Sequence, residues 1–389
     1  LRPHELDQVV QRAGGNPLFA TEIIKTAREV GSLDAVPLSL EAAMSAQVDA
    51  LDPDSRRVLR YASVLGRSFS RAVLEAIMAT EGHHLTDATL TLLAPFLDAD
   101  GTQRLRFRSG IVRDTTYEAV AYRLRSRLHR AAGETMERLA DDPASAADSL
   151  ALHFSRAGDD ERAWRYATLA AERARDAYAN TEAARLYELA LGAARELDDI
   201  DDQTLIDAWR NLGEARELAG EFDRSLDAFS RALKLARNDA VTRADLLLHR
   251  ATVKDRVRKL SAALTDLTKG TRALEGITND AAARLRARIL AFRAMVMFTQ
   301  GRLERALTAA RVAEQEARSV GDEESLGKAL LATGSLSMMM QGPQDDGYYR
   351  EALTLFQATG NLSMQGYVES NLGVLYAMAG RWSEAVELF

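Results

Sequence analysis

Residues 208–236 read AWRNLGEARELAGEFDRSLDAFSRALKLA, and this stretch decides the fold of the chain. It predicts two short amphipathic helices joined at Gly220, because large apolar residues recur three and four positions apart on both sides of that glycine. Gly213 and Ala232 are small, as residues must be where two helix axes approach closely. We therefore predict a helical hairpin whose two helices pack tightly against each other.

The spacing of these residues resembles the tetratricopeptide repeat, a helix–turn–helix unit of about 34 residues. The matching positions are Trp209, Leu212, Gly213, Phe222, Phe229 and Ala232. Two positions depart from the pattern, since Arg216 stands where an aromatic residue is usual and Ser225 where alanine is usual. The signature recurs in the same register at Asn371, Leu372, Gly373, Tyr376, Gly380, Trp382, Ala385 and Phe389. Two occurrences in register, with degenerate copies between them, predict an array of such repeats.

The array is expected to cover residues 141–389 and, by this resemblance, to form a right-handed all-α solenoid of six units. The turns inside the units are predicted near Tyr178, Gly220, Arg258, Gly301, Gln341 and Gly380. Each second helix offers a small residue and another residue four positions on: Ala183/Tyr187, Ser225/Phe229, Ala263/Leu267, Ala306/Ala310, Ala352/Phe356 and Ala385/Phe389. The fifth unit carries an insertion at 341–347. Because the sequence ends at Phe389, we expect the last unit to be truncated.

Residues 38–140 predict a different domain. Several helices come first, a β-hairpin follows at 96–109, and two more helices complete the segment. The hairpin is indicated by a turn at Asp100-Gly101 and by alternating basic and apolar residues after it. These are Arg104, Leu105, Arg106, Phe107 and Arg108. This order of elements is typical of a winged-helix domain, so the hairpin is the one β feature expected in an all-α chain.

The composition limits the possible functions. The formal net charge of −7 argues against nucleic-acid binding by the chain as a whole. The lack of cysteine excludes disulfides and thiolate metal sites, and fits a cytoplasmic location. The sequence contains no Gly-x4-Gly-Lys-Ser/Thr phosphate loop, no His-Glu-x-x-His motif, and no apolar run of about 18 residues. We therefore expect no catalytic residue, metal site or cofactor within these residues.

Two segments resemble parts of bacterial signal-transduction ATPases with numerous domains. They are Gly14-Gly15-Asn16-Pro17-Leu18-Phe19 and the stretch FRSGIVRDTTY at 107–117. That family joins an AAA-type ATPase core, a winged helix and a tetratricopeptide sensor to a nucleotide cyclase, a LuxR-type DNA-binding domain or a protein kinase. The resemblance implies that residues 1–37 are the tail of the ATPase lid. It also implies a longer parent protein that binds ATP or ADP and acts as an ATPase, an adenylate/guanylate cyclase, or both.

The same resemblance implies two nucleotide-contacting positions. Pro17 matches a proline that packs beside the adenine. Ser109 stands where a histidine often senses the nucleotide phosphates from the winged helix, and a serine there can still donate a hydrogen bond without carrying charge. Because the phosphate loop is absent, the upstream ATPase core of the parent is itself an expected partner of this chain.

In tetratricopeptide proteins, certain first-helix positions tend to line an inner groove. In the early units these positions are Arg165, Glu172, Arg175, Asp207, Arg210, Glu214 and Glu217. In the later units they are Met295, Phe298, Leu331, Met338, Tyr367 and Val374. We therefore expect a groove that is charged towards its N-terminal end and apolar towards its C-terminal end. Methionine-rich apolar surfaces adapt to partner helices or small apolar ligands, although Met338-Met339-Met340 could instead fill the core between units.

These features predict a regulatory sensor region without catalytic activity of its own. It would bind a protein, a peptide or a small molecule in the groove. The signal would pass through the winged helix to a nucleotide switch and an effector, either a transcriptional regulator or a nucleotide cyclase. One alternative is a passive protein-interaction scaffold. A weaker alternative is DNA binding through the winged helix, where arginines gather between 104 and 130. His129 and His153 lie among apolar neighbours and are expected to pack rather than to catalyse.

Overall fold

The computed structural model of the chain describes residues 9–10, 20–21, 24, 40–342 and 345–388. It divides into two compact units, residues 1–172 with 192–198 and residues 173–191 with 199–389. The segment 1–37, predicted as the tail of an ATPase lid, lies almost wholly outside the described residues, and so does Pro17. No helix in the described part of the chain is long and apolar enough to cross a bilayer.

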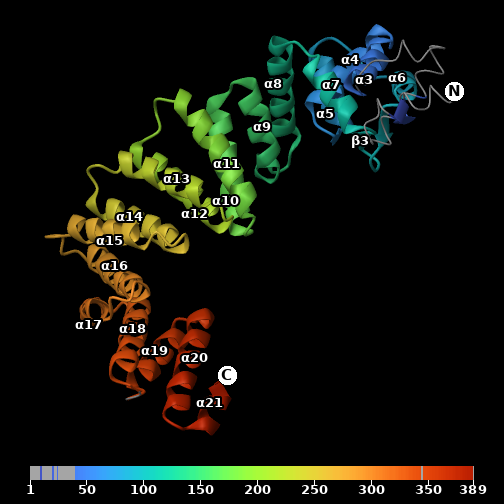
Figure 1. Cartoon of the computed structure of the whole chain (residues 1–389). Helices are drawn as coiled ribbons and strands as arrows, with labels where there is room; N and C mark the ends of the chain where they lie inside the picture. Colours follow the sequence, from blue (N-terminus) through green and yellow to red (C-terminus); the bar gives the residue numbers. More distant parts are fainter. Residues whose placement is uncertain (1–8, 11–19, 22–23, 25–39, 343–344, 389) are drawn as a thin grey trace. The chain divides into compact units, whose positions relative to one another are not determined.

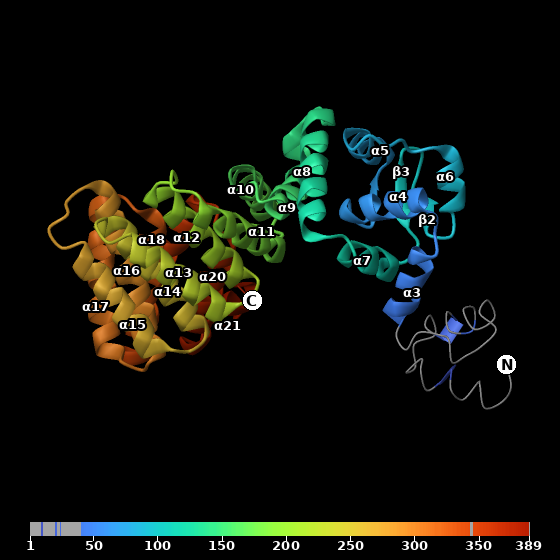
Figure 2. The same cartoon turned by 90° about the horizontal axis from the view of Figure 1, so that it is seen from above.

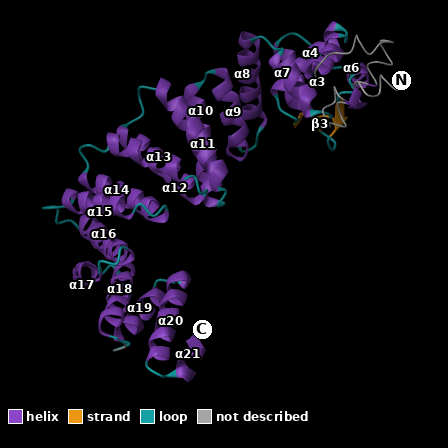
Figure 3. Ribbon diagram, in the orientation of Figure 1, coloured by secondary structure: helices purple, strands orange, loops and turns teal. Residues whose placement is uncertain are grey.

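The first unit combines helices with one small antiparallel sheet, the only strands among the described residues (Figure 3). Its elements are α3 (Leu40–Asp49), α4 (Pro53–Val64), β1 (Ser68–Ser70), α5 (Arg71–Thr80), α6 (Asp87–Leu92), β2 (Leu97–Ala99), β3 (Arg104–Phe107), α7 (Gly110–Glu118), α8 (Tyr122–Leu139), the short 3-10 helix η1 (Pro143–Ala146), α9 (Ala147–Ala157) and α10 (Asp160–Asp176), which spans the division. Figure 2 shows α4, α5 and α6 grouped around β2 and β3.

The sheet contains the predicted hairpin and one strand that the prediction missed. The central strand is β3, and its residue Arg106 lies opposite Ser68 of β1 and Asp98 of β2. A strand as short as Ser68-Phe69-Ser70 shows too little of the two-residue period to be recognised in a sequence. The sheet therefore has three strands instead of two. The assignment of residues 38–140 to a winged-helix domain stays a prediction, as do the boundaries at 37 and 140.

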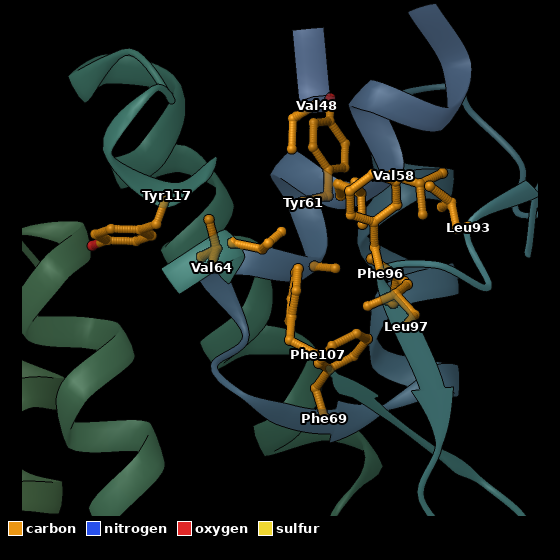
Figure 4. Close-up of a cluster of buried hydrophobic side chains, with 14 of the residues drawn as sticks. Val48, Val58, Tyr61, Val64, Phe69, Leu93, Phe96, Leu97, Phe107 and Tyr117 are labelled. Atoms are coloured by element: carbon orange, nitrogen blue, oxygen red, sulfur yellow. The ribbon is translucent and has the colours of Figure 1, made fainter. Parts of the chain in front are cut away.

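The core of the first unit forms where the helices meet this sheet (Figure 4). Phe69 of β1 and Phe107 of β3 are buried, and their ring centroids lie 5.9 Å apart. Helix α4 supplies Val58, which is also buried. The start of α4 is fixed by Asp52, whose carboxylate accepts hydrogen bonds from the N–H groups of residues 54 and 55 at 3.0 Å. Such a cap satisfies N–H groups that have no partner inside the helix.

The second unit is helical throughout its described residues. Its elements are α11 (Asn180–Ala193), α12 (Asp202–Leu218), α13 (Phe222–Leu235), α14 (Ala240–Arg256), α15 (Leu260–Ala273), α16 (Asp280–Thr299), α17 (Leu303–Val320), α18 (Glu323–Gln341), α19 (Gly347–Ala358), α20 (Leu362–Met378) and α21 (Trp382–Leu388). The last two residues of α11 and the 3-10 helix η2 (Ala194–Glu196) that follows belong to the first unit. Within each repeat, the first helix packs against the second, from the pair α12/α13 to the pair α20/α21. Figure 1 shows these pairs in succession. The predicted all-α repeat architecture is confirmed.

The predicted pairs of second-helix residues, four positions apart, explain how the two helices of a repeat pack. All members that the structure describes are buried: Ala183, Tyr187, Ser225, Phe229, Ala263, Leu267, Ala306, Ala310, Ala352, Phe356 and Ala385. The predicted close approach at Gly213 is confirmed as well, since a Cβ placed there would lie 2.8 Å from the ring of Phe229. An alanine at this position would force the buried ring to move.

Both departures from the repeat pattern have a structural reason. Arg216 is buried, forms an ion pair with Glu188 of α11, and donates a hydrogen bond to the carbonyl oxygen of Arg224 at 3.1 Å. The hydroxyl of Ser225 donates to the carbonyl oxygen of Gly213 at 2.7 Å. Both terminal nitrogens of the buried guanidinium are therefore paired, and the extra hydroxyl is satisfied, as buried polar groups usually are.

The turns within the units lie where the sequence places them. Positive φ angles occur at Tyr178, Gly220, Arg258, Gly301 and Gly380, and at Gly342 after the fifth predicted turn. The first five share one hydrogen-bonding pattern. In the turn at Gly220, for example, the N–H of Gly220 donates to the carbonyl oxygen of Glu217. The N–H of Glu221 donates to the carbonyl oxygen of Arg216. This pattern ends a helix and requires a left-handed residue, which is usually glycine.

We predict that Arg258→Gly stabilises the second unit by about 1 kcal/mol, because Arg258 adopts a left-handed φ of 60° that strains any residue with a Cβ. Its side chain is exposed and forms no ion pair or hydrogen bond with the residues that the structure describes. The measurement is urea unfolding followed by circular dichroism. The matched control is Gly220→Ala, which should be destabilising, and an unchanged or lower stability of Arg258→Gly would contradict the prediction.

Candidate functional site

The first helices of successive repeat units form one face of the second unit. Helix α12 contacts α14, α14 contacts α16, α16 contacts α18, and α18 contacts α20. The second helices, from α13 to α19, each contact the first helix of the following unit. Side chains of the first helices that point away from the second helices are therefore available to a ligand. We call the surface that they form the inner face.

A hollow of about 470 Å³ opens on the inner face between α12, α14, α16 and α18. We call it the central hollow. Its lining residues are Glu214, Glu217, Leu218, Leu248, His249, Thr252, Arg288, Phe292, Met295, Ser325 and Lys328. On α14 and α16 they recur at helical spacing, so each helix turns one side towards the hollow. A volume of this size is within the range of ligand-binding sites.

One wall of the central hollow is acidic, and its charges are already paired. Glu217 is buried and forms an ion pair with Arg256, with Nε and Oε1 2.8 Å apart. Burial raises the pKa of Glu217, and the charge of Arg256 offsets part of that effect. Glu214 lies 3.6 Å from Nε2 of His249 and 3.9 Å from Nε of Arg210. Both carboxylates of this wall therefore have basic neighbours within the chain.

The other wall, on α16 and α18, is basic and less well paired. Arg288 is exposed, and no ion pair or hydrogen bond joins its guanidinium to any residue described in the structure. Lys328 pairs with Glu324, one turn earlier on the surface of α18. An exposed pair of this kind contributes only about 0.3–0.5 kcal/mol. Positive charge is therefore available to a ligand on this side of the hollow.

A smaller hollow of about 30 Å³ lies beside the central hollow, between α16, α18 and α20. We call it the apolar hollow. It is lined by Met295, Phe298, Lys328, Leu331, Ala332, Ser335, Met364 and Tyr367. Met295 and Lys328 line both hollows, which are therefore adjacent. Met295 and Tyr367 are 39% and 55% exposed, although both side chains are largely apolar.

The structure brings several of the predicted groove residues together. Glu214 and Glu217 line the central hollow, and Met295 lies where the two hollows meet. Phe298, Leu331 and Tyr367 line the apolar hollow beside it. Asp207 and Arg210, two turns and one turn before Glu214 on α12, form an ion pair at 3.0 Å. The predicted positions thus change from charged on α12 to apolar on α16, α18 and α20.

Other predicted residues lie away from the two hollows. Met338 is half-buried and lines a separate hollow of about 170 Å³ formed by α17, α18, α19 and α20, whereas Met339 and Met340 are exposed. Arg175 donates to the hydroxyl of Tyr187 at 3.5 Å. Val374 is 40% exposed and contributes to neither hollow.

Three further predicted residues belong to the first unit. Arg165 donates a hydrogen bond to Glu137 at 2.7 Å, and Glu172 is exposed. Ser109 is the N-cap residue of α7, but its side chain accepts no capping hydrogen bond. Pro17 lies outside the described residues, so the nucleotide-contacting roles implied for Pro17 and Ser109 stay predictions.

Sequence reasoning missed the basic wall, although the repeat register contains a signal for it. The residues thirteen positions before the turn residues Gly220, Arg258, Gly301, Gln341 and Gly380 are Asp207, Asp245, Arg288, Lys328 and Tyr367. Charge at this equivalent position changes from acidic to basic and then to an uncharged aromatic along the array. Other missed lining residues are Leu218, Leu248, His249, Thr252, Phe292, Ser325 and Met364. The third unit had contributed no residue to the predicted groove.

A separate polar cluster is buried in the first unit. The hydroxyl of Tyr117 lies 3.0 Å from Nε2 of His129, and Nδ1 of His129 lies 3.0 Å from Nδ1 of His153. Burial lowers the pKa of His129 to about 3 and that of His153 to about 4. The guanidinium groups of Arg113 and Arg125 lie 4.9 and 4.5 Å from the centre of the Tyr117 ring. Within the described ranges, no three His, Asp or Glu side chains gather as metal ligands would.

Residues 206–239 match the tetratricopeptide repeat family. No curated protein matches the chain significantly. Among solved structures, one that matches is a signal transduction ATPase with numerous domains, with a tetratricopeptide repeat sensor, from Pyrococcus horikoshii, at 15% identity and a TM-score of 0.42. The alignment covers all of this chain and 58% of that one, so this chain spans little more than half of that protein's length.

Two other solved structures give similar values. The apo form of RapI is 13% identical with a TM-score of 0.47, over 70% of this chain and 90% of that chain. Aspartyl phosphate phosphatase F from Bacillus subtilis is 10% identical with a TM-score of 0.46, over 99% and 92%. The match at 206–239 covers α13 and most of α12, which pack as one of five consecutive helix pairs. The second unit is therefore an all-α array of tetratricopeptide-type repeats.

Proposed function

We propose that the inner face of the repeat array binds a segment of a partner protein. The observation that carries this proposal is that the central and apolar hollows lie side by side and share Met295 and Lys328. Together they extend across helices α12, α14, α16, α18 and α20. An elongated surface with charged side chains at one end and apolar ones at the other is suited to a peptide or a helix. A compact small molecule is usually enclosed on most sides, which an open face does not do.

The proposal includes a regulatory role within a longer parent protein. Binding in the hollows would favour one arrangement of the repeats, and residues 38–140 would pass this change to an ATP- or ADP-dependent switch. The effector would be a transcriptional regulator or a nucleotide cyclase. The resemblance of residues 14–19 and 107–117 to signal-transduction ATPases supports this part of the proposal. Without such a relay, the array would act as a scaffold.

The test is a selection of dodecapeptides from a phage-displayed random library on the purified chain. We predict enrichment of a shared motif, and at least tenfold weaker binding of the selected synthetic peptides to Met295→Asp/Tyr367→Asp. Charge placed in the apolar hollow would have to be desolvated by an apolar ligand. Both residues are exposed, so the substitutions should leave the fold intact.

Val312→Asp is the matched control, because Val312 is 44% exposed on α17 and lines neither hollow. This variant should bind like the unmodified chain. The proposal is wrong if no peptide is enriched over the selection without protein, or if the double variant binds as tightly as the unmodified chain.

A further inference from the structure

We infer that the segment bound by the inner face is acidic and apolar, with a carboxylate at Arg288 and Lys328 and a neighbouring bulky apolar side chain lying over the apolar hollow. This inference rests on the proposed function and adds the chemistry of the partner. Lys328 lines both hollows, so its side chain adjoins the apolar lining. An Asp or Glu side chain in the central hollow can therefore lie next to a Leu, Phe or Met side chain that covers the mouth of the apolar hollow.

The pairing of charges selects an anion over a cation. On the acidic wall, Glu217 is paired with Arg256 at 2.8 Å, and Glu214 has Arg210 at 3.9 Å. A cationic ligand would have to displace these basic partners. On the basic wall, Arg288 has no partner among the described residues, and Lys328 has only the exposed Glu324. An anionic ligand therefore gains new charge-assisted hydrogen bonds and loses little.

The order of the helices gives the ligand a direction along the inner face. The basic wall is on α16 and α18, and the apolar hollow continues from there to Met364 and Tyr367 of α20. On the opposite side the hollow ends at Glu214 and Glu217 of α12, which would repel a carboxylate. The acidic residue of the ligand should therefore lie over α16 and α18, with its apolar residue towards α20.

The test repeats the dodecapeptide selection on three proteins: the unmodified chain, Arg288→Glu/Lys328→Glu, and the control Arg284→Glu. Arg284 is an exposed arginine one turn before Arg288 on α16, and it lines neither hollow. The unmodified chain and the control should enrich Asp or Glu beside a bulky apolar residue. The double variant should enrich Lys or Arg instead, because its wall has the opposite charge. Circular dichroism checks that all three proteins are folded.

Affinities of the selected peptides make the expectation quantitative. Changing the acidic residue of a selected peptide to its amide should weaken binding to the unmodified chain about tenfold, and so should the double variant of the protein. Raising the salt concentration should weaken binding as well. If both proteins select the same peptides with equal affinity, the inference is wrong while the proposed function stands. If no protein enriches any peptide, the proposed function fails and the inference with it.

Discussion

Asp266→Ala should lower the free energy of unfolding of the second unit by about 3–5 kcal/mol, the usual cost of removing one partner from a buried ion pair. Asp266 of α15 is only 2% exposed. Its carboxylate accepts two hydrogen bonds from Arg250, at 2.7 and 2.8 Å, and another from Lys254. Both cations come from α14 and are themselves mostly buried. Without Asp266 they would remain near the interior without their counter-charge.

The protonation of Asp266 determines how this contribution depends on pH. Burial alone would raise the pKa of Asp266, but the hydrogen bonds from Arg250 and Lys254 outweigh it and hold the pKa below its ordinary value of 3.8. Because the pKa is lower in the folded than in the unfolded chain, the stabilisation is fully present above about pH 4. It is lost as the pH falls through the folded-state pKa. Comparisons of stability near pH 7 therefore measure the full effect.

The measurement is urea unfolding of the chain and of Asp266→Ala, followed by circular dichroism. Asp227→Ala is the matched control, because Asp227 forms an exposed pair with Arg231 within α13. Exposed pairs of this kind contribute little, so the control should change stability by less than about 0.5 kcal/mol. A loss below about 1 kcal/mol for Asp266→Ala would show that the three charged side chains are hydrated and not held as a buried cluster.

The burial of this cluster could not be predicted from the sequence. Asp266 lies between the predicted core positions Ala263 and Leu267, so its sequence context resembles that of an ordinary charged residue in a helix. Its burial depends on the antiparallel packing of α14 against α15, which brings residues 12 and 16 positions away to its carboxylate. The pairing of Arg216 with Glu188 is similar, because the two residues belong to different repeats of the second unit.

Features set by local geometry were predictable, whereas features set by several helices were not. The turns at Gly220, Gly301 and Gly380 follow from glycine and from helical spacing, both of which are visible in one stretch of sequence. The position of a residue within the first helix of a repeat was also enough to predict that Met295 and Phe298 line the groove. The central hollow was not predictable in the same way, because four helices separated by turns of unequal spacing form it together. Arg288 and Lys328 become neighbours only when those helices are stacked.

Lowering the pH from 8 to 5 should destabilise the first unit by about 4 kcal/mol through His129 and His153. Both side chains are buried, and burial lowers the pKa of His129 to about 3 and that of His153 to about 4. The ordinary value of 6.5 applies in the unfolded chain. At pH 5 the unfolded chain therefore binds a proton at each imidazole and the folded chain does not. Each histidine then contributes a loss of about 2 kcal/mol.

The direction of this effect follows from the folded-state surroundings. The positive charges of Arg113, Arg125 and Arg156 add to the desolvation that disfavours an imidazolium at His129. Neutral imidazoles also suit the observed chain of contacts, because the Tyr117 hydroxyl can donate to Nε2 of His129 while Nδ1–H of His129 donates to His153. Since the pKa values are lower in the folded chain, the stabilisation is complete above about pH 6.5. It is lost as the pH falls towards 4 and below.

The effect can be followed through Trp164, the tryptophan of α10 that lies in the first unit. In a Trp209→Phe/Trp382→Phe background, its fluorescence during urea unfolding gives the stability at each pH. His129→Phe/His153→Leu should be less stable at pH 8, because Tyr117 loses its hydrogen-bond partner.

The decisive quantity is the slope of the unfolding free energy with pH and not the free energy at one pH. Only this slope reports how many more protons the unfolded chain binds than the folded chain. Between pH 8 and 5 the double histidine variant should lose little, while the background protein loses several kcal/mol. His84→Gln, at an exposed histidine of the same unit, should keep the steep slope. Equal slopes in the double variant and in the background would mean that the two imidazoles keep ordinary pKa values in the folded chain. Water would then have to reach the contact between His129 and His153.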